Sequence, residues 1–347
     1  MGTLSRLRNP IALRERAHQQ HSAHVFGSRR LQAAYRIIYY PALTLTLVVF
    51  LSELGAALQP GDDRSAALVL HVAVIFALVV AVLMHLYLLL QTLLRASASM
   101  VREKQAGIWE ELILTGTDAR RLIVGKWWAT LQGTLGGFAL LIPLRAGVVV
   151  WLGAVFDRSQ ILNIEAVSSY VPPTTLAFLA TFPVIAVFTL GGSMLIAAVS
   201  VLASTLSRTL VQALALAFTL TVLVFGGTLG LLGVVHVASA QEAARSPEWH
   251  GVTGAFTENM LITWLDNGMT LTSELVNYET EYENISRQYV AESFASGKAT
   301  AWLLTFITCT GLYLLLTWSM LKLAQACAVR QGALPPQRGR ASMTSLL

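Results

Sequence analysis

Charged residues and cysteines are both scarce in this chain. Asp, Glu, Lys and Arg make up 12% of its 347 residues, about half the share of a typical soluble domain. Cys309 and Cys327 are the only cysteines, and on one helix they would lie roughly 27 Å apart, too far to bond to each other. These shortages exclude an ordinary soluble protein, a disordered chain and a disulfide-stapled secreted domain.

Apolar residues are abundant instead, at 55% of the chain with a mean hydropathy of +0.61. A helix needs about 20 apolar residues to cross a bilayer, and six runs are long enough. They cover residues 37–58, 66–94, 127–156, 176–202, 210–237 and 301–323. None shows the alternation of an outer-membrane β-strand. The sequence therefore predicts an all-α polytopic membrane protein with six transmembrane helices.

The basic residues predict the orientation of these spans. If the N-terminus lies in the cytoplasm, 18 of the 24 Lys and Arg fall in cytoplasmic segments or at their membrane edge. Residues 1–36 then form a cytoplasmic segment with a membrane-surface helix, and residues 324–347 form a flexible cytoplasmic tail. Residues 239–300 form a large outer loop. This basic excess reports topology rather than nucleic-acid binding, and it predicts a multi-pass protein of the plasma (bacterial inner) membrane.

The cytoplasmic loop 95–126 carries the most informative pattern. At 100° per residue, five apolar side chains share one face of a helix and four charged ones the other. The apolar set is Val101, Ile108, Trp109, Leu112 and Ile113, and the charged set is Glu103, Lys104, Glu110 and Glu111. We therefore expect an amphipathic helix along the membrane surface, broken at residues 115–117. Asp118 is placed to cap the next helix.

The order of residues in this loop resembles the signature of ABC type-2 transporter permeases. That signature runs roughly E-x-x-x-G-T-x-E-x-L-x-x-T-P, then Ser or Thr, basic residues and G-K. The matching residues are Glu103, Gly107, Glu110, Leu112, Thr115, Arg120, Gly125 and Lys126. Ile108 and Gly116 stand where the family usually has Thr and Pro, and Asp118 replaces Ser or Thr. The six-helix order, with this loop between helices 2 and 3, is similar to the family's architecture.

The resemblance implies that residues 37–323 form a permease domain and that the loop helix is a coupling helix, which docks on a cytoplasmic ATPase. It assigns ATPase coupling to Glu103, Gly107, Ile108, Trp109, Glu110 and Glu111, and the loop turn and cap to Gly116 and Asp118. A second permease copy, identical or related, completes the unit. ATP and magnesium would bind the ATPase, because Gly125-Lys126 lacks the preceding glycine and the following Ser or Thr of a phosphate-binding loop.

Two residues within the predicted spans are candidates for a substrate path or for contacts between helices. Arg145 is a full charge near mid-membrane, so either it faces protein or water, or its span begins late and the side chain reaches an interface. His85 is a candidate for an interhelix hydrogen bond or a substrate contact. No set of residues predicts a metal or catalytic site. A membrane transferase and a non-transporting signalling or assembly subunit are the alternative functions, and the substrate stays open.

Overall fold

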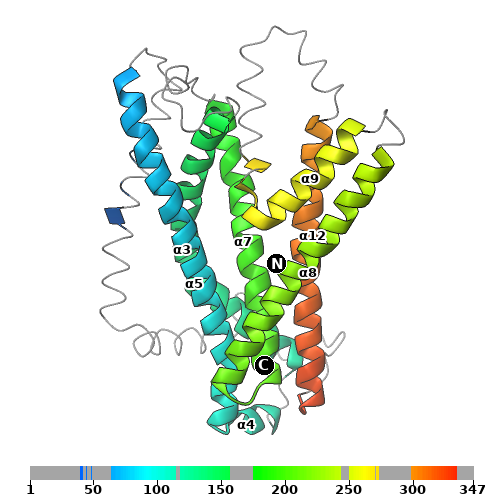
Figure 1. Ribbon diagram of the computed structural model, residues 1–347. Coiled ribbons are helices and arrows are strands. Elements are labelled where there is room, and N and C mark those ends of the chain that lie inside the picture. Colours follow the sequence, from blue (N-terminus) through cyan, green and yellow to red (C-terminus); the bar gives the residue numbers. More distant parts are fainter. Residues whose placement is uncertain are drawn as a thin grey trace, which may run out of the picture.

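The structure is a computed structural model that describes residues 64–114, 118–156, 175–243, 250–269, 271–272 and 298–333, with four helical positions at 40, 41, 44 and 48. Its long elements are helices (Figure 1). They are α3 (Arg64–Gln105), α4 (Ile108–Leu114), α5 (Ala119–Phe156), α7 (Thr175–Leu206), α8 (Leu210–Ala243), α9 (His250–Asp266) and α12 (Lys298–Arg330).

Five of these helices, α3, α5, α7, α8 and α12, are long and apolar enough to cross a membrane. They correspond to the second to sixth predicted spans, which confirms the helical class and indicates a membrane-embedded protein. The first predicted span, 37–58, falls almost wholly outside the described residues. Many large apolar side chains on α3, α8 and α12 are exposed, such as Phe218 at 64% and Leu315 at 58%, as lipid-facing residues are.

Helix α7 is the centre of the bundle and packs against α3, α5, α8 and α12 (Figure 1). Its spanning segment is the most buried of the five, whereas that of α8 is the least. Helix α9 packs between α8 and α12 at the end of the bundle opposite α4. We call these two ends the α4 end and the α9 end.

The end of α3, at the α4 end of the bundle, differs from the prediction. Helix α3 continues past residue 94 to Gln105, whereas α5 begins at Ala119, directly after the predicted cap Asp118. Helix α3 ends where Gly107 adopts a φ of +73°, which favours glycine. The expected single surface helix is therefore wrong: residues 97–105 extend a long helix, and α4 alone forms a separate short one.

The segment between α8 and α12, predicted as an outer loop, contributes to the bundle itself. Helix α9 buries Met260 and Trp264, and Leu271 follows them into the same apolar cluster with Phe188 and Tyr313. The apolar residues 260–265 are too few to cross a bilayer, but they are enough to bury one face of a helix that enters the bundle and stops inside it.

Candidate functional site

Helix α4 has a buried side and an exposed side, as its amphipathic sequence predicts. Trp109 is 7% exposed and packs in an apolar cluster with residues near the ends of α3, α5, α7 and α12. The Nζ of Lys104 lies 5.6 Å from the centre of the Trp109 ring, within the range of a cation–π contact. Glu110 and Glu111 are exposed, and Leu114 is 85% exposed.

Glu103 belongs to a buried ion pair and not to this exposed face. Its Oε1 lies 2.7 Å from the Nζ of Lys126, whose side chain is fully buried. Lys126 also donates to the main-chain oxygen of Ser99, at 3.1 Å. Lys126 therefore joins the start of α5 to the end of α3 inside the bundle.

Lys104 donates hydrogen bonds to main-chain carbonyl groups at the C-terminal end of α7. Its Nζ donates to the main-chain oxygens of Thr205 and Ser207, and the side chain of Gln331 donates to Thr205 O at 2.8 Å. The last carbonyls of a helix have no partners within the helix and carry the negative end of its dipole, so a lysine there is stabilising. Lys104 was predicted on the charged face of the surface helix, but it joins α3 to α7.

The remaining residues of the loop motif have varied positions. Ile108 is half-buried at the start of α4, beside the exposed turn at Gly107. Asp118 caps α5 as predicted, because its Oδ1 accepts from the main-chain N of Arg120 at 2.8 Å. Gly116 lies outside the described residues. Of the proposed coupling residues, only Gly107, Glu110 and Glu111 are exposed.

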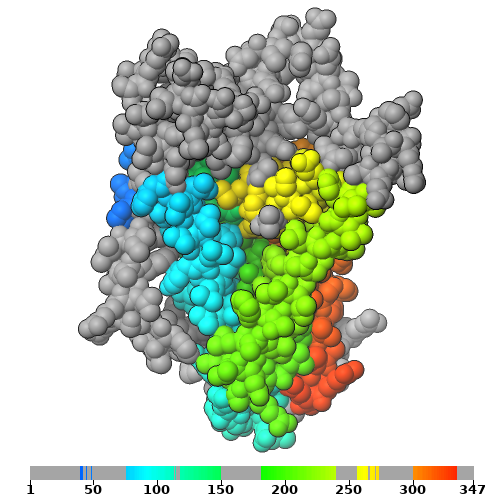
Figure 2. Space-filling model, in the orientation of Figure 1, coloured from blue at the N-terminus to red at the C-terminus, as the bar shows by residue number. Residues whose placement is uncertain are grey.

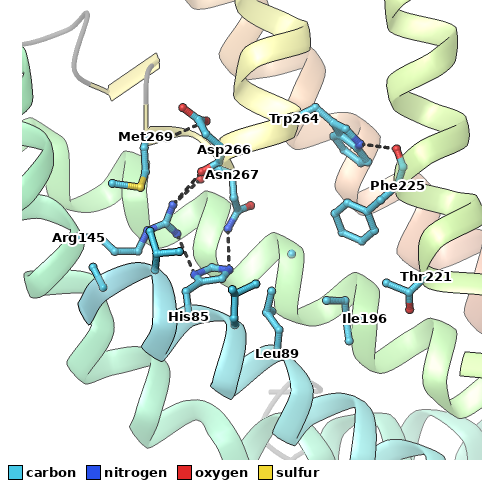
Figure 3. Close-up of a pocket in the computed structure, with 14 residues that line it drawn as sticks. His85, Leu89, Arg145, Ile196, Thr221, Phe225, Trp264, Asp266, Asn267 and Met269 are labelled. Atoms are coloured by element: carbon cyan, nitrogen blue, oxygen red, sulfur yellow. Dashed lines mark hydrogen bonds between the residues drawn. The ribbon is translucent and has the colours of Figure 1, made fainter. Parts of the chain in front are cut away.

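A second polar site lies in the middle of the bundle, around Arg145 (Figure 3). Arg145 is 2% exposed. Its Nη1 donates to Thr189 Oγ1 of α7 at 2.6 Å, and its Nη2 donates to the main-chain oxygens of Asp266 and Asn267 at 3.3 and 2.9 Å. The interface alternative for Arg145 is therefore wrong: its charge joins α5 to α7 and to the end of α9.

His85 of α3 completes this site through both of its ring nitrogens. Its Nδ1 lies 3.4 Å from Arg145 Nη1, and its Nε2 lies 3.4 Å from the Asn267 side chain. A guanidinium only donates, so Nδ1 is an acceptor, and a neutral imidazole then donates from Nε2. His85 makes interhelix contacts, one of the two roles predicted for it.

The Asn267 amide is drawn in Figure 3 with its nitrogen towards His85. The orientation turned by 180° satisfies more partners, and amide orientation is assigned from such contacts. The nitrogen then donates to Phe188 O at 3.0 Å and to Tyr313 Oη at 2.9 Å, and the oxygen accepts from Arg145 Nη1 at 3.2 Å. In this orientation the oxygen also faces His85 Nε2–H, so the network connects α3, α5, α7 and α12 to the end of α9.

A cavity of about 370 Å³ lies beside this network. Arg145, His85, Asp266 and Asn267 line it together with many apolar residues, including Leu86, Leu89, Ile196, Phe225, Trp264 and Met269. Figure 3 shows His85 and Asn267 on one side of the space and Phe225 and Trp264 on the other. The volume is in the range of small-molecule pockets.

Sequence reasoning identified Arg145 and His85 but missed their partners Thr189, Asn267 and Tyr313. Asp266-Asn267-Gly268 is a recognisable turn signal after an apolar patch. That signal could have predicted the end of α9. It could not have predicted that the turn meets Arg145, because the two are more than 120 residues apart in the chain.

Comparisons of the chain with protein-family models, with curated proteins and with solved structures found no match. The functional argument therefore depends on the sequence pattern and on these two sites.

Proposed function

We propose that this chain is the permease subunit of an ABC-type exporter and that α4 couples it to a separate ATPase subunit. The observation that carries the proposal is that α4 packs one side into the bundle and leaves the other side exposed. Its buried side is fixed to the ends of long helices, while Glu110, Glu111 and Leu114 remain exposed for a second protein.

The packing around α4 suits the transmission of force. Close-packed interiors transmit strain rather than absorb it. Trp109 and the buried Ala96, Leu122, Leu202 and Ala328 form one cluster, so displacement of α4 would move the ends of α3, α5, α7 and α12 together. The exposed carboxylates of Glu110 and Glu111 are suited to charge-assisted contacts with a basic groove.

In this proposal the α4 end faces the cytoplasm of a bacterial inner membrane and both termini lie on that side, as the distribution of Lys and Arg indicates. The first predicted span completes six helices. Two copies of the permease and two ATPase subunits form the working unit, with ATP and magnesium on the ATPase.

Purification of the tagged chain from its native host in mild detergent tests the proposal, with mass spectrometry of the proteins that remain bound. We expect a soluble ATPase that contains a phosphate-binding loop, recovered near one-to-one. Recovery of the chain alone after cross-linking would overturn the proposal and favour a membrane enzyme. An ATPase whose activity no transported substrate stimulates would favour a signalling or assembly subunit.

Reversal of charge at Glu110 is expected to weaken binding of the ATPase by about tenfold or more, since a charge-assisted contact becomes a repulsive one. Because the Glu110 side chain is exposed, Glu110→Lys should leave folding and membrane insertion unchanged. The measurement is the amount of ATPase bound per folded permease.

Glu258→Lys is the matched control for this charge reversal. Glu258 is also an exposed glutamate on a helix, but it lies on α9, at the other end of the bundle. We expect Glu258→Lys to bind the ATPase normally. Equal binding by both variants and the wild type would remove Glu110 from the docking surface.

A further inference from the structure

We propose that the mid-bundle cavity binds an amphiphile with one carboxylate, which enters from the lipid phase and places its acid group beside Arg145. The claim that this amphiphile is the transported substrate rests on the proposed function. The claim that it binds here rests on the cavity and the residues that line it.

The body of the cavity fits an apolar chain. Leu86, Leu89, Ile196, Phe225 and Trp264 line it, and its volume of about 370 Å³ equals roughly a dozen water molecules at their share of liquid volume. An aliphatic chain of about ten carbons is of this size. Polar groups gather at one end, as in ligand sites that fix the orientation of an apolar ligand.

The cavity has access to the lipid-facing surface between α3 and α8. Two of its lining residues, Val82 and Leu86 of α3, are 44% and 57% exposed. Figure 2 shows the surface hollowed between α3 and α8, below α9, with α7 behind. An amphiphile can therefore enter sideways with its chain already in an apolar environment.

The charge at the polar end selects an anion. Arg145 is buried, and within the part of the chain that the structure describes its hydrogen bonds go to neutral acceptors: a threonine hydroxyl, an imidazole nitrogen, a side-chain amide oxygen and two main-chain oxygens. Hydrogen bonds to neutral groups leave the full positive charge in place. Asp266 attracts the guanidinium, but none of the hydrogen bonds from Arg145 to the described residues goes to a carboxylate. An acid group arriving from the cavity would give this buried cation a hydrogen-bonded counterion.

Asp266 is the acidic residue that lines the cavity, and its negative charge attracts Arg145. It offers Arg145 its main-chain oxygen, while Oδ1 of its carboxylate accepts from the main-chain N–H groups of Gly268 and Met269 at 2.9 and 3.1 Å. Its side chain is partly exposed, whereas Arg145 is buried. The guanidinium is therefore the more deeply buried of the two charges, and the Asp266 carboxylate is not one of its hydrogen-bond acceptors.

A carboxylate can reach Arg145 without breaking its short hydrogen bonds. The contact from Nη1 to His85 Nδ1 is 3.4 Å, against 2.6 Å to Thr189 Oγ1, and long contacts are weak. A ligand oxygen that replaces the His85 contact would gain a charge-assisted hydrogen bond. His85 and Arg145 both line the cavity, so the replaced contact lies next to the space that the ligand occupies.

The test is the binding of radiolabelled decanoate to the full-length chain in lipid nanodiscs, measured at about pH 8, where an aqueous carboxylic acid is ionised. Empty nanodiscs give the background. Unlabelled decanoate, decanol, decylamine and acetate serve as competitors. We expect decanoate to compete at least about tenfold better than decanol, and acetate and decylamine to compete poorly. Equal competition by decanol, stronger competition by decylamine, or competition by acetate at the decanoate concentration would overturn the proposal.

Variants test the position of the site. Thr221→Trp places a large side chain on the cavity wall and should abolish binding, whereas Val222→Trp, its exposed neighbour on α8, should bind normally. Arg145→Gln should remove the preference for decanoate over decanol, and Arg145→Lys should restore part of it. If the Arg145 variants do not fold, the comparison of Thr221→Trp with Val222→Trp and the competition measured on the wild type still test the proposed site. Equal binding by Thr221→Trp and Val222→Trp would contradict the site. None of these measurements requires the ATPase. A negative result would therefore overturn the binding site without bearing on the proposed permease function.

Discussion

Glu103→Ala is expected to lower the free energy of unfolding by about 3–5 kcal/mol, because it leaves a buried ammonium group without its counterion. Lys126 is fully buried and 2.7 Å from Glu103. After the substitution it keeps its contact with Ser99 O, but a neutral carbonyl does not replace a carboxylate. The measurement is denaturant-induced unfolding in mixed micelles.

Two further variants separate loss of charge from loss of volume. Glu103→Gln keeps the size and one hydrogen-bond acceptor, so we expect a smaller loss of stability. Combining Glu103→Leu with Lys126→Met removes both charges from the bundle, and we expect it to regain much of the stability lost in Glu103→Ala, as buried ion pairs replaced by apolar residues often do. Glu110→Ala should be neutral, since Glu110 is exposed.

These variants also divide the loop motif by role. The resemblance places Glu103 and Glu110 together in a docking helix, whereas the structure puts one inside the bundle and the other on its surface. We therefore expect Glu103→Ala to reduce the amount of folded permease while leaving ATPase binding per folded molecule unchanged. Reduced ATPase binding by correctly folded Glu103→Ala would contradict this division.

The helical bundle could be predicted from the sequence, because long apolar runs without alternation have few other structures open to them. The start of α5 after the Asp118 cap could be predicted too, but the end of α3 could not. Residues 95–105 contain no Gly or Pro, and periodicity does not show whether such a stretch extends a span or begins a surface helix. The break falls at Gly107, which the family motif places inside the docking helix.

The mid-bundle site was predicted only in part, for a related reason. A single Arg145 in an apolar run is conspicuous from composition alone. Its partners are ordinary residues in sequence: a threonine, an asparagine and main-chain carbonyls. They become a site only when α9 enters the bundle, and that depends on tertiary packing of residues such as Trp264 against Tyr313.

Gly268→Ala is expected to release the end of α9 from the bundle. Asn267 and Gly268 have φ angles of 55° and 86°, and Gly268 N donates to Thr263 O at 3.0 Å, so the pair closes α9 in the manner of a Schellman motif. A methyl group at Gly268 would overlap the Phe188 ring. Phe188 is fully buried and packs edge-on against Phe306 and Tyr313, so it has little room to move.

The cost of Gly268→Ala should be about 1–2 kcal/mol for the left-handed backbone and about 1–3 kcal/mol more for the overlap. Because Asn267 O accepts from Arg145, loss of this turn would also leave the guanidinium under-bonded. Hydrogen exchange should therefore show reduced amide protection over residues 266–272 before the long helices lose theirs.

Gly226→Ala on α8 is the matched control, because its new methyl group would meet no described atom within 4 Å, and we expect unchanged or slightly higher stability. Equal protection of residues 266–272 in Gly268→Ala and Gly226→Ala would mean that α9 is not held in the bundle by this turn.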